Sequence, residues 1–393
     1  MKKTALEKRI KRRIIAKNHT FFASCAPGLK NLLIQEIANL NLESKKIITK
    51  AGGVEFSGKL HDCYLANLNL RIPIRILMRI NKFKADNFSA LEKQIEKIDF
   101  ELFLRTGADL NFHVSTTKSK LYHTKAIAQR VEKIIISKLL NCEKPMGQKQ
   151  SDFTHDIFIR SENNNFDISL DTSGDLLYKR GIKKDSIHAP LRENLAFAAL
   201  VFAGYSRNDV IIDPMCGSGT FSLEASMVKQ NIPPGFARAF AFQSFQCFRE
   251  QKWNYIKNQA QNKFNMDIQN DIFASDIDKK AIDAIKQNIK KFNFNKNINI
   301  VQKDFFDIYP DKLTKQKGVI VLNPPYGKRI GNRSEISYFY NEIGKKLIKD
   351  FKGWRLGIVM PEKRLLKNYK FQKTMIRSFY HGGLDIFLLT AII

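Results

Sequence analysis

No run of apolar residues in this sequence approaches the ~18 that a membrane-spanning helix requires, although hydrophobic residues make up 44% of the chain. The basic amino terminus also lacks an apolar core followed by small residues, which a secretory signal would have. Internal repeats and low-complexity tracts are absent as well. These absences predict a soluble globular protein that neither spans a membrane nor carries a secretory signal.

Cysteine is scarce, and its spacing is informative. The five cysteines contain no Cys-x-x-Cys pair and stand far apart, at Cys25, Cys63, Cys142, Cys216 and Cys247. A scattered set of this kind argues against a zinc site and against a disulfide framework. We therefore expect reduced thiols, as in a cytoplasm, and no bound metal.

Acidic residues are few relative to basic ones. The chain has 66 Lys and Arg against 38 Asp and Glu, which gives a formal net charge of +28. This excess favours a polyanionic partner, with nucleic acid the first candidate and an acidic membrane the second. Abundant Asn, Ile, Phe and Lys are also typical of an AT-biased genome, so part of the charge reflects codon composition.

Residues 1–17 concentrate this charge, because they carry eight basic residues and a single acid, Glu7. The segment is predicted to be a flexible basic arm or a short helix that contacts phosphate. A solvated tail without a role explains the same residues about as well.

Short strands and helices alternate over the amino-terminal half. A strand pattern over Phe21–Ala23 and an apolar helical face over Thr124–Leu140 indicate small α+β units. We divide this half into a unit over 18–70, which residues 172–182 would complete, and a second unit over 71–172.

A shift in composition at Gly181–Pro190 marks the predicted linker. Over residues 183–393, strands and helices alternate with longer periods, which is typical of a mostly parallel, doubly wound α/β sheet. Strand patterns over Thr374–Ile392, interrupted by His381-Gly382-Gly383, predict a terminal β-hairpin.

The stretch Val319–Gly327 organises this second half. Val319–Leu322 is an apolar, β-branched run that reads as a buried parallel strand. It ends in Asn323-Pro324-Pro325-Tyr326, where the two prolines force the backbone out of the sheet. Such a turn at the carboxyl end of a strand holds an amide, a carbonyl and an aromatic ring at the edge of a ligand crevice.

A second motif, Asp213–Thr220, is a strand-to-helix turn whose glycines let a ligand approach the backbone. A dinucleotide fingerprint would need a third glycine where Ser222 stands. Asp213 instead suits a cationic ligand such as S-adenosylmethionine, which carries an ammonium and a sulfonium. Asp276 and Asp304 follow the next two predicted strands and would accept the ribose hydroxyls and the adenine amine. Each acid taken alone is more typical of a helix N-cap.

Together, these two motifs resemble the class I methyltransferases that modify exocyclic or amide nitrogens. With Pro190–Ala196 and Asn231–Phe242, the resemblance narrows to the THUMP-domain RNA guanine-N2 methyltransferases, in particular the bacterial 23S rRNA enzymes. It covers the chain from about residue 20 onward and implies a Rossmann-like methyltransferase domain over 183–393. It also implies a ferredoxin-like unit over 18–70 and a THUMP RNA-binding domain over 71–172.

The resemblance implies roles for individual residues, with S-adenosylmethionine as cofactor and 23S rRNA or a large-subunit precursor as partner. The predicted cofactor-binding residues are Asp213, Pro214, Cys216, Gly217, Gly219, Thr220, Asp276 and Asp304. The predicted catalytic residues are Asn323, Pro324 and Tyr326, and the predicted RNA-binding residues are Lys118, Lys120, Tyr122, His123 and Arg329.

The residue types at the Asn-Pro-Pro-Tyr turn agree with this chemistry. The exocyclic amine of guanine is a weak nucleophile because its lone pair is delocalised into the ring. The amide oxygen of Asn323 and the carbonyl of Pro324 would accept its two N–H bonds and direct that lone pair toward the sulfonium methyl. Tyr326 would stack on the base once the nucleotide is flipped out of its helix.

Several other functions share these motifs. Methylation of a tRNA guanine at N2, of adenine at N6 or of a release-factor glutamine uses a similar turn, although a protein substrate would not require a charge of +28. Methylation of a pyrimidine at C5 needs a cysteine nucleophile, which the Asn323–Tyr326 turn lacks. A non-enzymatic RNA-binding ribosome-assembly factor is the alternative from another class, and the intact acids and Asn323 argue against it.

Overall fold

The computed structural model describes residues 4–43, 46–140, 154–182, 191–266, 268–292, 297–325, 333–381 and 384–393. The chain forms two compact units. The first comprises Met1–Cys25, Leu33–Leu177 and Arg238–Asn258, and the second comprises Ala26–Leu32, Tyr178–Ala237 and Gln259–Ile393. The chain therefore passes between the units several times, and neither unit is one continuous stretch of sequence.

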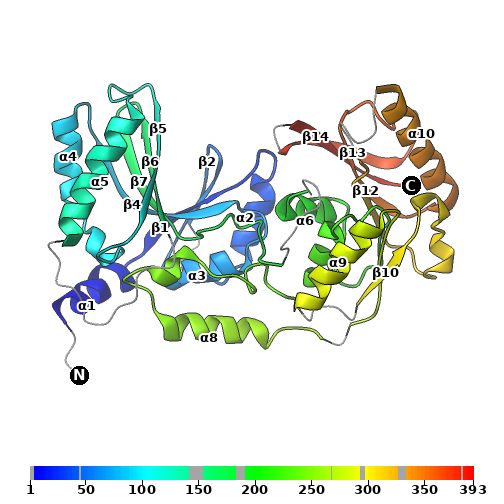
Figure 1. The fold of residues 1–393 in the computed structure, drawn as a ribbon, viewed down its shortest axis with the longest axis horizontal. Helices are drawn as coiled ribbons and strands as arrows, with labels where there is room; N and C mark the ends of the chain where they lie inside the picture. The colour runs from blue at the N-terminus through cyan, green and yellow to red at the C-terminus, as the bar shows by residue number, and fades with distance from the viewer. Residues whose placement is uncertain are drawn as a thin grey trace. The chain divides into compact units, whose positions relative to one another are not determined.

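The first unit is built on a seven-stranded sheet with the order β2-β3-β1-β4-β7-β6-β5 (Figure 1). Its strands are β1 (His19–Ser24), β2 (Ile47–Lys50), β3 (Gly53–Gly58), β4 (Arg75–Lys84), β5 (Leu110–Thr117), β6 (His155–Glu162) and β7 (Asn165–Asp171). Neighbouring strands are antiparallel except for the parallel pair β5 and β6. Because β4 pairs with both β1 and β7, the two units predicted over 18–70 and 71–172 share one continuous sheet.

Helices cover this sheet through apolar faces. They are α1 (Ala5–Ile10), α2 (Lys30–Ala38), α3 (Leu60–Asn69), α4 (Phe88–Glu96) and α5 (Thr124–Leu140), with short turns η1 (Lys11–Ile15) and η2 (Phe100–Leu102). Helix α5 has the bounds expected from its sequence, and its residues Ile127, Val131, Ile135 and Leu139 are buried. Figure 1 shows α4 lying beside α5, which packs against β5.

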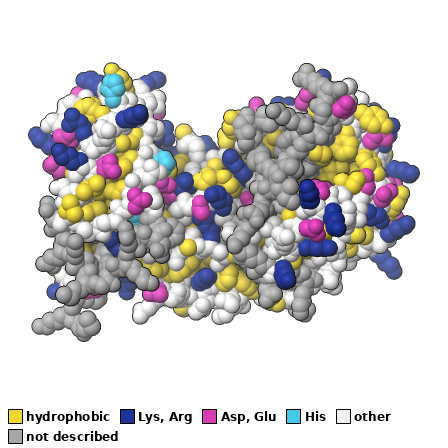
Figure 2. Space-filling model, in the orientation of Figure 1, with side chains coloured by type: hydrophobic (Ala, Val, Ile, Leu, Met, Phe, Trp, Pro, Cys, Tyr) yellow, Lys and Arg dark blue, Asp and Glu magenta, His cyan; other side chains and the backbone are white. Residues whose placement is uncertain are grey.

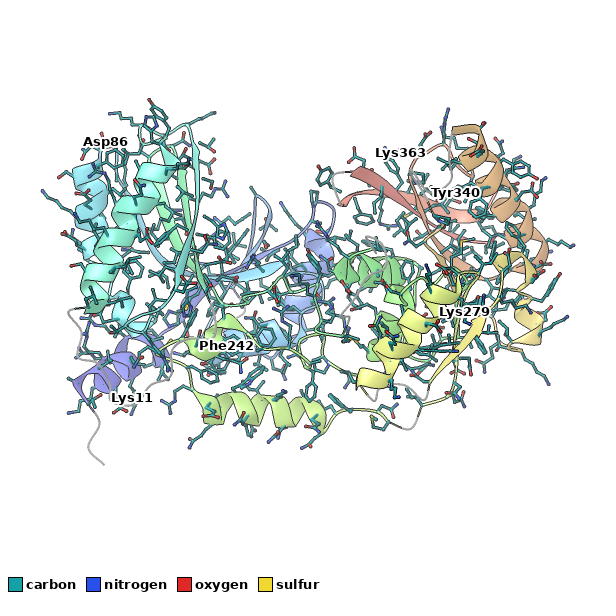
Figure 3. All side chains as sticks on the ribbon, viewed as in Figure 1. Lys11, Asp86, Phe242, Lys279, Tyr340 and Lys363 are labelled. Atoms are coloured by element: carbon teal, nitrogen blue, oxygen red, sulfur yellow. The ribbon has the colours of Figure 1, made fainter. Side chains whose placement is uncertain are left out.

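Residues Arg238–Asn258 interrupt the second unit in the sequence but pack with the first. They contain η3 (Ala241–Ser244) and most of α8 (Glu250–Gln261). The ring of Phe242, labelled in Figure 3, stacks on Tyr64 of α3 with 4.5 Å between centroids, and Trp253 packs edge-on against both rings. These buried aromatic rings hold the segment in the first unit, although the sequence-based boundaries, which stay a prediction, include it in 183–393.

The second unit contains the predicted doubly wound sheet, with the order β10-β9-β8-β11-β12-β14-β13. Its strands are β8 (Ile211–Asp213), β9 (Ile272–Asp276), β10 (Ile298–Gln302), β11 (Val319–Leu322), β12 (Arg355–Met360), β13 (Gln372–His381) and β14 (Leu384–Ile392). The first five run parallel, while β14 is antiparallel to β12 and to β13. The fold class is therefore confirmed, including the terminal hairpin.

Helices pack on both faces of this sheet. They are α6 (Glu193–Phe202), α7 (Thr220–Lys229), α9 (Lys279–Phe292) and α10 (Arg333–Asp350). Ile320 and Leu322 of β11 share a buried cluster with Tyr340 and Ile343 of α10. The sheet is thus sandwiched between helices, as its nearly continuous apolar strands require.

Lys and Arg side chains are scattered over the face drawn in Figure 2, among acidic and hydrophobic ones. None of the described helices is long and apolar enough to cross a membrane. Most of the predicted linker, residues 183–190, lies outside the described residues.

Candidate functional site

The predicted site residues of the second half gather at one edge of the sheet. Strands β10, β9, β8 and β11 are parallel neighbours in that order, so their carboxyl ends meet at the same edge. Asp213 and Asp276 end β8 and β9, Asp304 lies two residues after β10, and Asn323 directly follows β11. In parallel α/β sheets, ligands bind outside this edge, where the strand order reverses. Here the reversal falls at β8, with β9 on one side and β11 on the other.

The loop between β8 and α7 has the backbone shape that its glycines predict. Gly217 has φ +53°, and a Cβ atom added to it would meet nothing within 4 Å. Gly219 has φ +84°, and its Cβ would lie 2.5 Å from Cδ1 of Ile285 on α9. Gly217 therefore leaves open space above the loop, whereas Gly219 allows the loop to pack closely against α9.

Asp213 is fully buried and anchors α7. Its Oδ2 accepts a 2.7 Å bond from the Ser222 hydroxyl and a 3.2 Å bond from the Ser222 backbone N–H. Ser222, which replaces the third glycine of a dinucleotide fingerprint, thus has a structural task here. The predicted contact between Asp213 and a ligand ammonium is not tested by these bonds and stays a prediction.

Asp276 and Asp304 are half-buried and shape the adjacent loops. Asp276 accepts a 2.8 Å bond from Gly217 N–H and a 3.0 Å bond from Asp278 N–H. Asp304 is the N-cap of η4 (Phe305–Asp307), where it accepts a 3.0 Å bond from Phe306 N–H. An ionised carboxylate offers about four acceptor positions, so both side chains retain capacity for hydroxyl or amine donors.

Cys216 lies in the same loop, and its environment disfavours a thiolate. Burial raises the pKa of Cys216 well above the usual range for a thiol, and the negative charges of Asp213 and Asp276 raise this pKa further. The Cys216 N–H donates to Ser275 O at 2.9 Å and ties the loop to β9. A protonated, buried thiol is a poor nucleophile. Cys216 is therefore unsuited to the methylation of a pyrimidine at C5, which needs a cysteine nucleophile.

The turn after β11 presents an acceptor without a donor. Asn323 Oδ1 is buried and receives no hydrogen bond from any residue that the structure describes. Pro324 is buried and Pro325 is half-buried. A buried polar atom left in this state costs free energy unless a ligand or water satisfies it. The predicted residues Tyr326 and Arg329 lie outside the described residues.

The structure adds residues that the sequence did not single out. Ile277, next to Asp276, is 66% exposed although it is apolar. Asn288 of α9 donates to Ser218 O at 3.3 Å and braces the Asp213–Thr220 loop. The sequence shows that an isoleucine follows this acid, but only the structure shows that its side chain is exposed. In the described parts of the chain, no three His, Cys, Asp or Glu side chains come together as metal ligands would.

The predicted RNA-binding turn lies in the first unit, between β5 and α5. Lys118, Lys120, Tyr122 and His123 are exposed, and the Tyr122 and His123 rings lie 4.1 Å apart. The Lys120 ammonium is 3.1 Å from the Asp86 carboxylate, and this bond and charge lower the pKa of Asp86. Asn164 fixes the turn, since its Oδ1 accepts from Lys120 N–H at 2.7 Å.

Family models match both halves of the chain. Residues 180–385 match the RMKL-like methyltransferase domain, and residues 20–77 match the RlmL ferredoxin-like domain. The predicted ferredoxin-like unit at the amino-terminal end is therefore confirmed.

Known proteins resemble the chain over nearly its whole length. A Synechocystis protein named "Putative RNA methyltransferase slr0064" is 32% identical over 95% of this chain and 97% of its own. The ribosomal RNA large subunit methyltransferase K/L of Methylococcus capsulatus is 31% identical over 93% of this chain, which spans 50% of that longer protein.

Solved structures agree with these relatives. The crystal structure of a methyltransferase complexed with SAH superposes with a TM-score of 0.84, at 27% identity, over 96% of this chain and 98% of that one. The open loop at Gly217 and the acids at adjacent strand ends are consistent with such a ligand. The chain thus belongs to the RNA methyltransferase family with an RMKL-like methyltransferase domain, and S-adenosylmethionine is its methyl donor.

Proposed function

We propose that this protein transfers a methyl group from S-adenosylmethionine to the exocyclic N2 amine of a guanine in 23S rRNA. The observation that carries this proposal is the buried Asn323 Oδ1, which no described residue satisfies, at the sheet edge beside the cofactor loop. An amine-bearing base supplies the missing donor. The names of the K/L relatives support a large-subunit ribosomal RNA as the substrate.

The turn after β11 would position and activate the guanine amine. Asn323 Oδ1 and the Pro324 carbonyl accept the two N–H bonds, which turns the nitrogen lone pair toward the incoming methyl group. Tyr326 stacks on the face of the base and holds it out of the RNA helix. Because the bound cofactor supplies an electrophilic methyl with a good leaving group, the chain needs no strong general base, and the amine proton passes to water.

The Asp213–Thr220 loop and the two following acids would hold the cofactor. Asp276 accepts from the ribose hydroxyls, Asp304 accepts from the adenine amine, and Asp213 favours the ammonium by its charge. Pro214, Cys216, Gly217, Gly219 and Thr220 shape the loop around it. The exposed Ile277 is placed to contact the adenine face, since it follows Asp276 directly.

Selection of the RNA would reside mainly in the first unit. The turn after β11 recognises an amine and a flat ring, which is too little to choose one nucleotide in a ribosomal RNA. We assign residues 71–172 to a THUMP RNA-binding domain, with Lys118, Lys120, Tyr122 and His123 contacting phosphate and bases, and Arg329 assisting near the catalytic turn. The Lys120 ammonium pairs with the Asp86 carboxylate in the structure. An RNA phosphate would therefore have to replace this carboxylate as the partner of Lys120.

Methyl transfer to isolated ribosomal RNA tests the proposal. We expect the protein, given S-adenosylmethionine and 23S rRNA from a strain that lacks the enzyme, to produce N2-methylguanosine at one position. N6-methyladenosine as the product would instead establish the adenine alternative, and methylation of tRNA but not 23S rRNA would establish the tRNA enzyme. Cofactor binding without methyl transfer to any of these RNAs would favour the non-enzymatic ribosome-assembly factor.

The cofactor assignment of Asp276 makes its own prediction. Asp276→Ala should weaken binding of S-adenosylhomocysteine by roughly 5- to 150-fold, which corresponds to about 1–3 kcal/mol for unpaired hydroxyls. Isothermal titration calorimetry measures this directly. Asp283→Ala, which removes an exposed acid from the nearby α9, is the matched control and should bind like wild type. Equal affinities for wild type and Asp276→Ala would refute the assignment.

A further inference from the structure

The amino-terminal basic segment is an ordered helix over its described residues. Helix α1 begins with a capping box, in which Thr4 Oγ1 accepts from Glu7 N–H and the Glu7 carboxylate accepts from Thr4 N–H. It continues into the π-helical turn η1. Ile10 and Ile14 are 6% and 4% exposed. The segment is therefore anchored by an apolar stripe.

Two arginines of this helix are neutralised by acids of the first unit. Arg9 lies 3.1 Å from Asp99 and 2.6 Å from Glu101, and Arg13 also pairs with Asp99. Both arginines follow one side of the helix, four residues apart. These ion pairs fix the rotation of the helix about its axis and leave its other basic residues facing elsewhere.

The remaining cations form a stripe that faces solvent. Lys8, Lys11 and Arg12 are exposed, and no described carboxylate lies within 4.0 Å of their charged groups. Their spacing of three and four residues places them on one side, with about 5–6 Å between neighbouring Cβ atoms. Lys11 is labelled on this helix in Figure 3.

Further positive charge lies at the end of the helix. Lys17 is exposed, and Lys59 Nζ donates to Ala16 O at 2.6 Å. Burial lowers the pKa of His19, and the positive charges of Lys59 and Lys17 lower this pKa as well. Lys17 and Lys59 therefore add positive charge near the carboxyl end of this segment.

We propose that Lys8, Lys11 and Arg12 form a phosphate-binding stripe that contacts the RNA backbone, in addition to the contact made by the Lys118–His123 turn, and that Lys17 adds positive charge at the end of the segment. This inference rests on the proposed RNA-modifying function. Like charges three and four residues apart destabilise a helix, so an unpaired cluster favours an anionic partner. The helix is already ordered, so binding pays no backbone entropy to form it.

The structure favours RNA over a membrane as the partner of the stripe. A helix that binds a lipid surface inserts its apolar face into the bilayer. Here the apolar face, Ile10 and Ile14, is buried against the first unit. The exposed part of the helix therefore offers positive charge but no apolar surface. Such a surface suits contacts with phosphate groups, which add affinity without recognising the base sequence.

Salt-dependent RNA binding tests the stripe. The variant Lys8→Ala/Lys11→Ala/Arg12→Ala keeps the capping box, the buried isoleucines and both paired arginines. We expect the full-length variant to bind a structured 23S rRNA fragment at least about tenfold more weakly at 0.15 M salt, because two or three phosphate contacts are lost. The slope of log affinity against log salt should become shallower by about 2.

Matched variants separate the stripe from bulk charge and from folding. Lys315→Ala/Lys349→Ala/Lys352→Ala removes three exposed lysines of the second unit, outside the proposed RNA-binding domain, and should bind RNA nearly as wild type does. Lys8→Arg/Lys11→Arg should retain the full salt slope. Thermal midpoint and S-adenosylhomocysteine affinity should be the same in all variants.

Several outcomes would overturn the inference. One is a wild-type salt slope in the stripe variant, and another is an equal loss of RNA affinity in the triple-lysine control of the second unit. A third is loss of binding to phosphatidylserine vesicles with RNA binding intact, which would assign the stripe to a membrane. If the wild-type chain binds no RNA at all, the proposed function itself fails, and the stripe fails with it.

Discussion

Asn323→Ala should methylate RNA at least about a hundredfold more slowly than wild type, the scale of losing one group that stabilises a transition state. Its affinity for S-adenosylmethionine should hardly change. The reason is the position of Asn323 Oδ1, which is buried at the end of β11 and receives no bond from the described residues. Alanine removes the acceptor that orients the amine but leaves the loop between β8 and α7 untouched.

Single-turnover kinetics with saturating cofactor and RNA measure this effect on the chemical step. Asn254→Ala, which truncates an exposed asparagine of α8, is the matched control and should react at the wild-type rate. Loss of cofactor affinity in Asn323→Ala, with an unchanged single-turnover rate, would instead show that Asn323 only supports the loop.

Much of the catalytic half could be predicted because its signals are local. The run Val319–Leu322 is apolar enough to be a buried strand, and the two prolines after Asn323 mark its end. Helix α9 is also readable from the sequence, because its apolar residues recur with the helical period. Once several strands are known to be parallel, the residues that follow them must share one edge of the sheet.

The packing of Arg238–Asn258 could not be predicted in this way. The segment joins the first unit because Phe242 and Trp253 contact Tyr64, which is far away in the sequence. A local sequence pattern does not predict a contact between residues so far apart in the chain. A fragment over 183–393 would therefore carry these rings without their partner. Such a fragment is a poor test of the catalytic unit, because its exposed aromatic surface favours aggregation.

The site acids show why single residues mislead. In isolation, Asp304 was expected to be a helix N-cap, and it does cap η4. Asp213 likewise bonds Ser222 at the start of α7. These bonds and a role toward the cofactor are compatible, because a carboxylate accepts several donors. The functional hypothesis rested on the position of three acids after three successive strands. Only the structure shows which hydrogen bonds each of these acids accepts.

Arg180→Met should destabilise the second unit by about 3–5 kcal/mol, the cost of removing one member of a buried ion pair. Arg180 Nε donates to Glu224 Oε1 at 2.9 Å, and the two side chains are only 2% and 1% exposed. Glu224 lies on α7, directly after the Asp213–Thr220 loop. The pair therefore anchors the helix that begins at the cofactor loop, and its loss should lower the urea midpoint.

The double variant Arg180→Met/Glu224→Leu distinguishes an unpaired charge from lost packing. Two apolar side chains of similar volume often replace a buried pair without loss of stability, so most of the free energy of unfolding should return. Lys345→Met, which breaks the exposed pair with Glu342 on α10, should leave the midpoint nearly unchanged. Trp354, buried in the same unit, reports unfolding by fluorescence.

If Arg180→Met unfolds at the wild-type urea concentration, the pair does not stabilise α7. Close packing of Gly219 against Ile285 then becomes the stronger explanation for the ordered cofactor loop.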